Sequence, residues 1–249
     1  MTLTLYNFPQ STCSQKVRLV LWEKGLPFED RIVDHKSREH LQPPYLALNP
    51  NGVVPTLVHD DEVIIDSSVI VEYLDEVFPE NSLSMPDAVG RAHLRKWLRY
   101  FEEVPTPAIR VPSFNQYLVK RYATMSEDQY AEMADNHPIR KHFYQRLNKS
   151  SFSDSETGEA LDRLQQTADR VESALGADGR PWLMGERITL ADACLLPTID
   201  RAADLGLGRL WEGTHPAVTG WYERYREREA YKKTYYPGTR LTEIFASAG

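Results

Sequence analysis

Residues 49–68 read Asn-Pro-Asn-Gly-Val-Val-Pro-Thr-Leu-Val-His-Asp-Asp-Glu-Val-Ile-Ile-Asp-Ser-Ser, and this stretch decides the fold. It predicts a turn, a short strand that opens on Pro55, a charged hairpin turn, a second strand and a helix that starts at Asp66-Ser67. Because proline has no backbone N–H, the extended segment that ends at Val54-Pro55 offers a free backbone edge to a partner outside the sheet. Asp66 and Ser67 add a carboxylate, a hydroxyl and unpaired helix amides. Together they predict a socket for a small peptide, with an edge for its backbone and a polar cap for its charged end.

The composition is typical of a soluble globular protein. The chain has 249 residues, 41% hydrophobic and 26% charged, enough for one large or two modest domains. The formal net charge of −7 and the lack of a dense Lys/Arg cluster argue against a nucleic-acid partner. No apolar run reaches the length of a membrane span, no signal peptide is visible, and Cys13 and Cys194 form no metal-like cluster. We therefore expect a cytoplasmic protein with no membrane partner.

The first third of the chain predicts a small α/β domain over residues 1–80. Apolar spacing and turn residues predict, in order, a strand at 3–8, a helix at 14–24, a strand at 28–33, an irregular Pro-interrupted stretch at 36–48, the hairpin, and a helix at 67–78. The first elements imply a parallel βαβ unit and the charged turn implies an antiparallel hairpin. This is the thioredoxin-like order, βαβαββα.

The rest of the chain predicts an all-α domain over residues 88–249. A polar linker bounded by prolines covers 79–86, and the periodicity is helical from there on. We expect helices at 90–104, ended or kinked by Pro105 and Pro107, and at 127–135, 139–147, 159–175, 190–205 and 217–228. The Ser-rich stretch 148–158 predicts a mobile loop.

Four motifs, in order along the chain, resemble the cytosolic glutathione transferase superfamily. Ser11-Thr-Cys-Ser-Gln-Lys-Val-Arg18 looks like the active-site turn of the serine-type zeta and phi classes, and its core is similar to plant dehalogenase-like members. Asn49-Pro-x-Gly-x-Val-Pro-x-Leu57 and Asp66-Ser67 look like the two halves of the family's glutathione site. Gly185-Glu-Arg-Ile-Thr-Leu-Ala-Asp192 resembles the family's helix-six capping box, in which Thr189 caps the helix, Asp192 reaches back and Ile188 is a hydrophobic staple.

The resemblance implies glutathione as co-substrate and a homodimer. It assigns the backbone of Val54, before a cis bond to Pro55, to the cysteinyl unit of glutathione, and Asp66 and Ser67 to the γ-glutamyl end. His40 and Lys36 are candidates for the glycine carboxylate, although a solvated polar helix explains both equally well. Asp66 stands where the family more often has Glu, which keeps the charge and shortens the reach.

The thiol of glutathione must ionise, because the thiolate is the nucleophile. A hydroxyl at the start of the first helix would stabilise it, together with the positive helix end. The candidates there are Ser11, Thr12, Cys13 and Ser14. A plain helix cap is the simplest interpretation of the serines, whereas the phi and zeta resemblance favours Ser11 as the catalytic hydroxyl. Ser14 is the alternative, since the beta-etherase-like pattern keeps a serine at that position.

The helical domain is longer than in compact family members by about residues 130–159. A similar insert, with a run like Asn136-His-Pro-Ile139, occurs in bacterial beta-etherase-type members that cleave aryl ethers with glutathione. The resemblance therefore favours a small hydrophobic or aromatic electrophile as acceptor, attacked by the thiolate with possible ether or halide cleavage. Arg110 is the candidate contact for an anionic acceptor. Two alternatives stay open: a binding or regulatory module without catalysis, and a thiol-disulfide reductase that uses Cys13.

Overall fold

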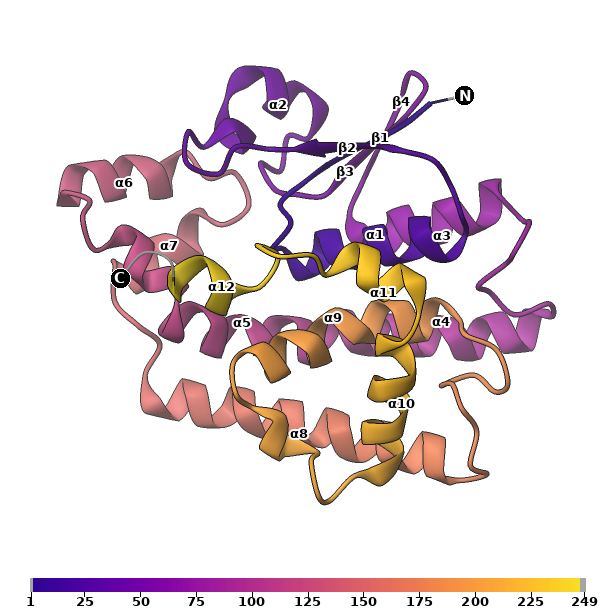
Figure 1. Cartoon of the computed structure of the whole chain (residues 1–249). Helices are drawn as coiled ribbons and strands as arrows, with labels where there is room; N and C mark the ends of the chain where they lie inside the picture. Colours follow the sequence, from indigo (N-terminus) through magenta and orange to yellow (C-terminus); the bar gives the residue numbers. More distant parts are fainter. Residues whose placement is uncertain (1, 247–249) are drawn as a thin grey trace.

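The computed structural model describes residues 2–246, so Met1 and 247–249 at the ends of the two expected domains lie outside it. The N-terminal part has the predicted thioredoxin-like order (Figure 1). Its elements are β1 (Leu3–Asn7), α1 (Thr12–Glu23), β2 (Glu29–Ile32), a 3-10 turn (Glu39–Leu41), α2 (Pro43–Leu48), β3 (Thr56–His59), β4 (Glu62–Ile65) and α3 (Ser67–Val77). The sheet order is β2-β1-β3-β4, with β1 and β2 parallel and the other pairs antiparallel.

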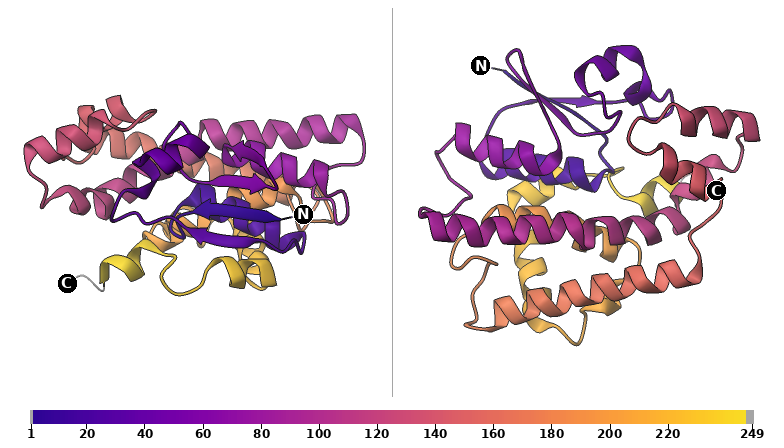
Figure 2. Two further views of the ribbon diagram at one scale, coloured as in Figure 1. Left: turned by 90° about the horizontal axis from the view of Figure 1, so that it is seen from above. Right: turned by 180° about the vertical axis from the view of Figure 1, so that it is seen from behind.

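The helices divide between the two faces of this sheet. α1 and α3 lie on the face toward the helical domain, and α2 lies on the opposite face (Figures 1 and 2). Every residue from Ser14 to Leu21 in α1 is buried, because α1 packs against α3 on one side and against α9 and α11 on the other. Its first turn therefore sits at the junction of the two parts of the molecule.

The C-terminal part is helical throughout. Its elements are α4 (Ala88–Glu103), α5 (Pro105–Gln116), a 3-10 turn (Leu118–Tyr122), α6 (Glu127–Asp135), α7 (Lys141–Leu147), α8 (Asp154–Gly176), α9 (Leu190–Asp204), a 3-10 turn (Gly208–Leu210), α10 (Pro216–Arg226), α11 (Glu229–Thr234) and α12 (Leu241–Ala246). None of the helices within residues 2–246 combines the length and the apolar character needed to cross a membrane.

Several local features differ from the sequence prediction, which also gave no helix at α11 or α12. The stretch expected to be irregular contains α2, because Pro43 and Pro44 occupy the first helical positions, where no backbone N–H is needed. α8 begins inside the expected loop, at Asp154, because Ser153 and Glu156 form a capping box there. The prolines after α4 do end it, but Pro105 also opens α5, a helix that the sequence did not predict.

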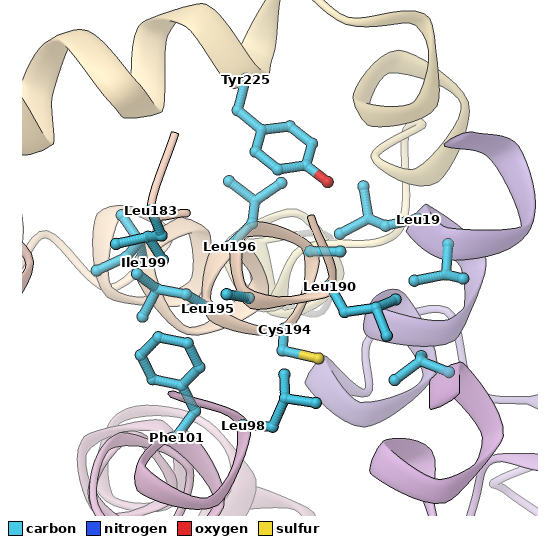
Figure 3. Close-up of a cluster of buried hydrophobic side chains, with 14 of the residues drawn as sticks. Leu19, Leu98, Phe101, Leu183, Leu190, Cys194, Leu195, Leu196, Ile199 and Tyr225 are labelled. Carbon is cyan, nitrogen blue, oxygen red and sulfur yellow. The ribbon is translucent and has the colours of Figure 1, made fainter. Parts of the chain in front are cut away.

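One hydrophobic core joins the two parts. Figure 3 shows Cys194, Leu195 and Ile199 of α9 surrounded by side chains from several helices, among them Leu98 of α4 and Leu19 of α1. α9 therefore packs directly against α1 in this core, and the position of the α1 N-terminus depends on this packing.

Candidate active site

Two adjoining hollows lie where the α/β part meets the helices α5 to α7. The inner hollow, of about 180 Å³, is lined by the first turn of α1, the loop before β3 and the helices above it. The outer hollow, of about 830 Å³, lies between the loop after β2, the segment 121–144 and α12. The two share lining residues, including Phe8, His40 and Tyr144, so they form one continuous site open to both parts of the chain.

Ser11 caps α1 and faces the inner hollow at the same time. Its Oγ accepts a hydrogen bond from the Ser14 backbone N–H at 3.3 Å, and Ser11 lines the hollow. A hydroxyl that accepts one bond still has its own hydrogen to donate. The 12-residue helix behind it adds the positive end of its dipole. The cap and a thiolate-stabilising hydroxyl are therefore compatible in one residue.

The other candidates in this turn have different surroundings. Thr12 and Cys13 line the inner hollow, and Cys13 is a half-buried free thiol. Ser14 is fully buried, does not line the hollow, and its Oγ has no hydrogen-bond partner within the described chain. This burial could not be read from the sequence, and it favours Ser11 over Ser14.

The loop before β3 presents a free backbone edge. The Val54-Pro55 bond is cis, and Val54 lines the inner hollow. The neighbouring Val53 carbonyl accepts from the Tyr45 hydroxyl at 2.7 Å and from the Asn49 amide at 2.8 Å. Among the backbone hydrogen bonds of the described residues outside helices and strands, none involves Val54. The loop is thus fixed from behind while this edge stays open.

Asp66 and Ser67 lie at the same end of the sheet as Val54, because Thr56 pairs with Ile65 across the hairpin. Asp66 is an exposed N-cap of α3 whose Oδ1 accepts from Ser68 N at 2.9 Å and from Val69 N at 3.2 Å. Its φ of 71° is strained for a residue other than glycine, and such strain clusters at functional sites. Ser67 is buried, and neither residue lines the two hollows.

Three histidines line the site, and only His40 was predicted from the sequence. The rings of His35 and His40 stack at 5.6 Å between centroids, and His137 lies 5.8 Å from His40. Burial, then neighbouring cations such as Arg121 and Arg140, lower the pKa of His35 and His137 to about 3 and that of His40 to about 4. All three rings are neutral near pH 7. His40 and His137 each keep an Nδ1 without a partner in the described chain.

The long segment between α5 and α8, which contains most of the insert 130–159, forms one wall of the site. Gly52 has a φ of +60°, and a Cβ there would lie 2.9 Å from Pro138 Cδ. The insert therefore packs directly on the backbone beside Val54 and carries His137, Arg140 and Tyr144 into the inner hollow. The run 136–139 was the available signal in the sequence, but it gave no reason to assign these side chains to the site. Of the predicted cations, Arg110 lines the inner hollow and Lys36 the outer one.

Comparison with known families decides what this geometry belongs to. Residues 5–82 match the profile described as "Glutathione S-transferase, N-terminal domain", and residues 128–224 match "Glutathione S-transferase, C-terminal domain". The chain belongs to the glutathione S-transferase family. It is an enzyme of this family, with glutathione as its co-substrate. No group of three or more His, Cys, Asp or Glu within residues 2–246 is arranged to hold a metal ion.

Three relatives cover the chain almost end to end. Protein LigF from Sphingobium sp. (strain NBRC 103272 / SYK-6) is 29% identical over 96% of this chain and 95% of its own. The crystal structure of that beta-etherase superposes with a TM-score of 0.86 over 94% of this chain and 98% of its own, at 30% identity. Glutathione S-transferase 3 of Zea mays is 30% identical over 93% and 92%. The tetrachloro-p-hydroquinone reductive dehalogenase of Sphingobium chlorophenolicum is 26% identical over 92% and 94%.

Proposed function

We propose that the glutathione thiolate, stabilised by Ser11, attacks an electrophilic carbon of an aromatic acceptor and expels an aryloxide or a halide. In this step a C–S bond forms, the C–O or C–halogen bond breaks, and the leaving group takes the bonding electron pair. The proposal rests on one observation above all: the Ser11 hydroxyl lies at a helix N-terminus and faces a hollow built from both parts of the chain. The choice of these two leaving groups is supported by the relatives, which include a beta-etherase and a reductive dehalogenase.

Glutathione is held by residues 1–80 and the acceptor by residues 88–249 in this proposal. The open backbone of Val54 pairs with the cysteinyl unit, and the free Oδ2 of Asp66 receives the γ-glutamyl amine, with Ser67 beside it. The glycine carboxylate then points toward His40, and this placement is supported because His40 lines both hollows. A neutral imidazole donates one hydrogen bond to such a carboxylate, and Arg140 of the insert adds a positive charge beside it.

Apolar and aromatic side chains support an aromatic acceptor. The inner hollow carries Ile109, Leu118 and Tyr122 on the side of the helical domain. The outer hollow adds Met125 and Phe245. Its volume, about 830 Å³, lies within the usual range for small-molecule sites, roughly 300–1,000 Å³.

We further propose a cytoplasmic homodimer. Both cysteines are free thiols, as a reducing compartment favours. Val63 of the edge strand β4, Val69 and Val77 of α3 and Val89 at the start of α4 are exposed. These side chains belong to consecutive elements and supply an apolar surface for a second copy. Light scattering coupled to gel filtration gives the mass in solution.

The test compares binding, conjugation and disulfide reduction in wild-type protein and Cys13→Ala. We expect retention on glutathione-agarose and conjugation of 1-chloro-2,4-dinitrobenzene by both proteins. Retention without any turnover would point to a binding module. Reduction of mixed disulfides that disappears in Cys13→Ala would instead identify a thiol-disulfide reductase, for which the position of the Cys13 thiol in the hollow is suitable.

A further inference from the structure

The inner hollow has an unbalanced charge. Its described lining includes four arginines and three histidines and neither Asp nor Glu. A guanidinium group removed from water by burial is costly unless an anion lies close to it. An anion bound in the hollow would offset that cost. The partners that each arginine already has within the protein indicate which of them is available to bind such an anion.

Two of the four arginines are already engaged by the protein. Arg201 donates to the Gln10 carbonyl at 2.5 Å and lies 3.8 Å from Asp204. Arg121 donates to His35 Nε2 at 3.1 Å and stacks over Phe245. Arg201 thus links α9 to the loop after β1, and Arg121 links the 3-10 turn 118–122 to the loop after β2.

Arg110 has no hydrogen bond and no ion pair to another described residue. Its only described partner is the ring of Phe143, 5.9 Å from the guanidinium carbon. Burial and the charge of Arg140 lower the pKa of Arg110. The whole donor fork of this side chain is therefore available to a ligand, in a place where an anion would be bound strongly.

The position of Arg110 separates it from the ends of glutathione. It lies on α5 and lines the same hollow as Ser11 and Cys13 of the first turn of α1. The γ-glutamyl end is assigned to Asp66 and the glycine end to His40. The anion that Arg110 meets is therefore on the acceptor, next to the apolar side chain of Ile109.

We propose that the acceptor is an aromatic carboxylate and that Arg110 binds its carboxylate while the ring rests on the apolar wall of the inner hollow. This inference rests on the proposed function, in that it names the class of acceptor for the same site. Planar carboxylates match the guanidinium fork in two parallel hydrogen bonds.

Matched acceptors measure this preference directly. 4-Chloro-3,5-dinitrobenzoate and 1-chloro-2,6-dinitrobenzene share the ring, the nitro groups and the leaving chloride, and differ only in the carboxylate. In both, the glutathione thiolate forms the C–S bond and chloride leaves with the electron pair. We expect wild-type kcat/KM, relative to the uncatalysed rate, to favour the carboxylate. Arg110→Gln lowers that preference by at least about tenfold, the loss expected for a charge-assisted pair.

Two further variants control the result. Arg110→Lys keeps the charge but loses the fork, so it should recover part of the preference. Arg146→Gln removes an arginine of the insert 130–159 that is paired with Glu156 and lies outside both hollows, and it should keep the preference. Thermal melting of each variant establishes that it is folded.

A binding measurement separates this inference from the proposed function. Unreactive 3,5-dinitrobenzoate and 1,3-dinitrobenzene are titrated by calorimetry in the presence of S-methylglutathione. Tighter binding of the carboxylate, lost in Arg110→Gln, supports the inference even if neither chloro compound is turned over, a result that would defeat only the proposed function. Equal binding of the two compounds overturns the inference. So does an equal loss of kcat/KM for both chloro compounds in Arg110→Gln, since Arg110 would then act on the thiolate.

Discussion

The starts of α9 and α1 are built from the same kind of residue but differ in how far their polar groups are satisfied. At α9 the fully buried Asp192 accepts from the Thr189 N–H and hydroxyl, from the Leu183 N–H at 2.9 Å and from the Trp221 indole at 2.9 Å. At α1 Ser11 accepts one bond at 3.3 Å and faces a hollow. A saturated helix start holds the fold together, whereas one with spare hydrogen-bonding capacity is available to a ligand.

The largest expected effect is on stability, at the start of α9, where the polar groups are fully hydrogen-bonded. Asp192→Ala leaves several buried donors without an acceptor, so we expect a loss of roughly 3–5 kcal/mol in unfolding free energy. A simple cap would cost only about 0.5–2 kcal/mol. Denaturant unfolding measures the loss, and Asp192→Asn, which keeps one acceptor oxygen, should fall in between. Normal stability combined with lost turnover would contradict a purely structural role.

The buried histidines of the site make the stability of the protein depend on pH. Burial lowers the pKa of His137 to about 3, against about 6.5 in an unfolded chain. Between these values the unfolded chain binds the proton and the folded chain does not. Stability is therefore complete above about pH 6.5 and falls as the pH drops toward 3, by about 3 kcal/mol at pH 4.5 for this one group. Unfolding at pH 7 and pH 4.5 should show this loss in wild type and a smaller one in His137→Gln. Equal losses would show that His137 is protonated in the folded state.

At the open helix start, Ser11→Ala should weaken catalysis more than binding. Losing a donor to the charged thiolate raises the pKa of the bound thiol and costs about 2–3 kcal/mol, or roughly 30- to 150-fold in turnover at neutral pH. Part of the activity should return in alkali, with glutathione affinity nearly intact. The thiolate absorbance of bound glutathione against pH measures this directly. Cys13→Ala and Ser14→Ala are the controls, and a shift confined to Ser14→Ala would make Ser11 only a cap.

The smallest expected effect is on glutathione affinity. Asp66 is both an exposed N-cap and the proposed partner of the γ-glutamyl amine. Asp66→Ala should weaken glutathione binding by about 1.5–2 kcal/mol, roughly 10- to 30-fold, in a calorimetric titration. Asp66→Asn accepts the positive φ and keeps the cap while losing the charge, so it separates the two contributions. An unchanged dissociation constant in both folded variants would exclude the assignment.

Local signals made much of the fold predictable. Pro55, the charged hairpin turn and the Thr189–Asp192 spacing act over a few residues, and the structure contains the elements they predict. The start of α8 was missed because the polar residues after Ser153 were interpreted as a loop, whereas they are the exposed face of a capped helix. Sequence spacing reports such a face poorly when the capping signal is overlooked.

The site was less predictable because it depends on tertiary packing. The sequence placed Ser11, Cys13 and Ser14 within one turn, but only the tertiary packing of α1 shows that Ser14 is buried and that Ser11 lines the hollow. His137 and Arg140 are far from that turn in sequence and reach it only because the insert docks there. No local pattern indicates such an approach.

The close contact of Pro138 with Gly52 holds the insert against the loop before β3 and leaves no room for a side chain at residue 52. A methyl group at Gly52 would push the insert away from the sheet and would also strain a backbone with a φ of +60°. Such a change would shift the segment that carries His137, Arg140 and Tyr144 and would therefore alter the shape of the inner hollow. Anyone who wishes to redesign this enzyme for larger molecules has a single position at which to begin, one that lies outside the groups assigned to the chemistry.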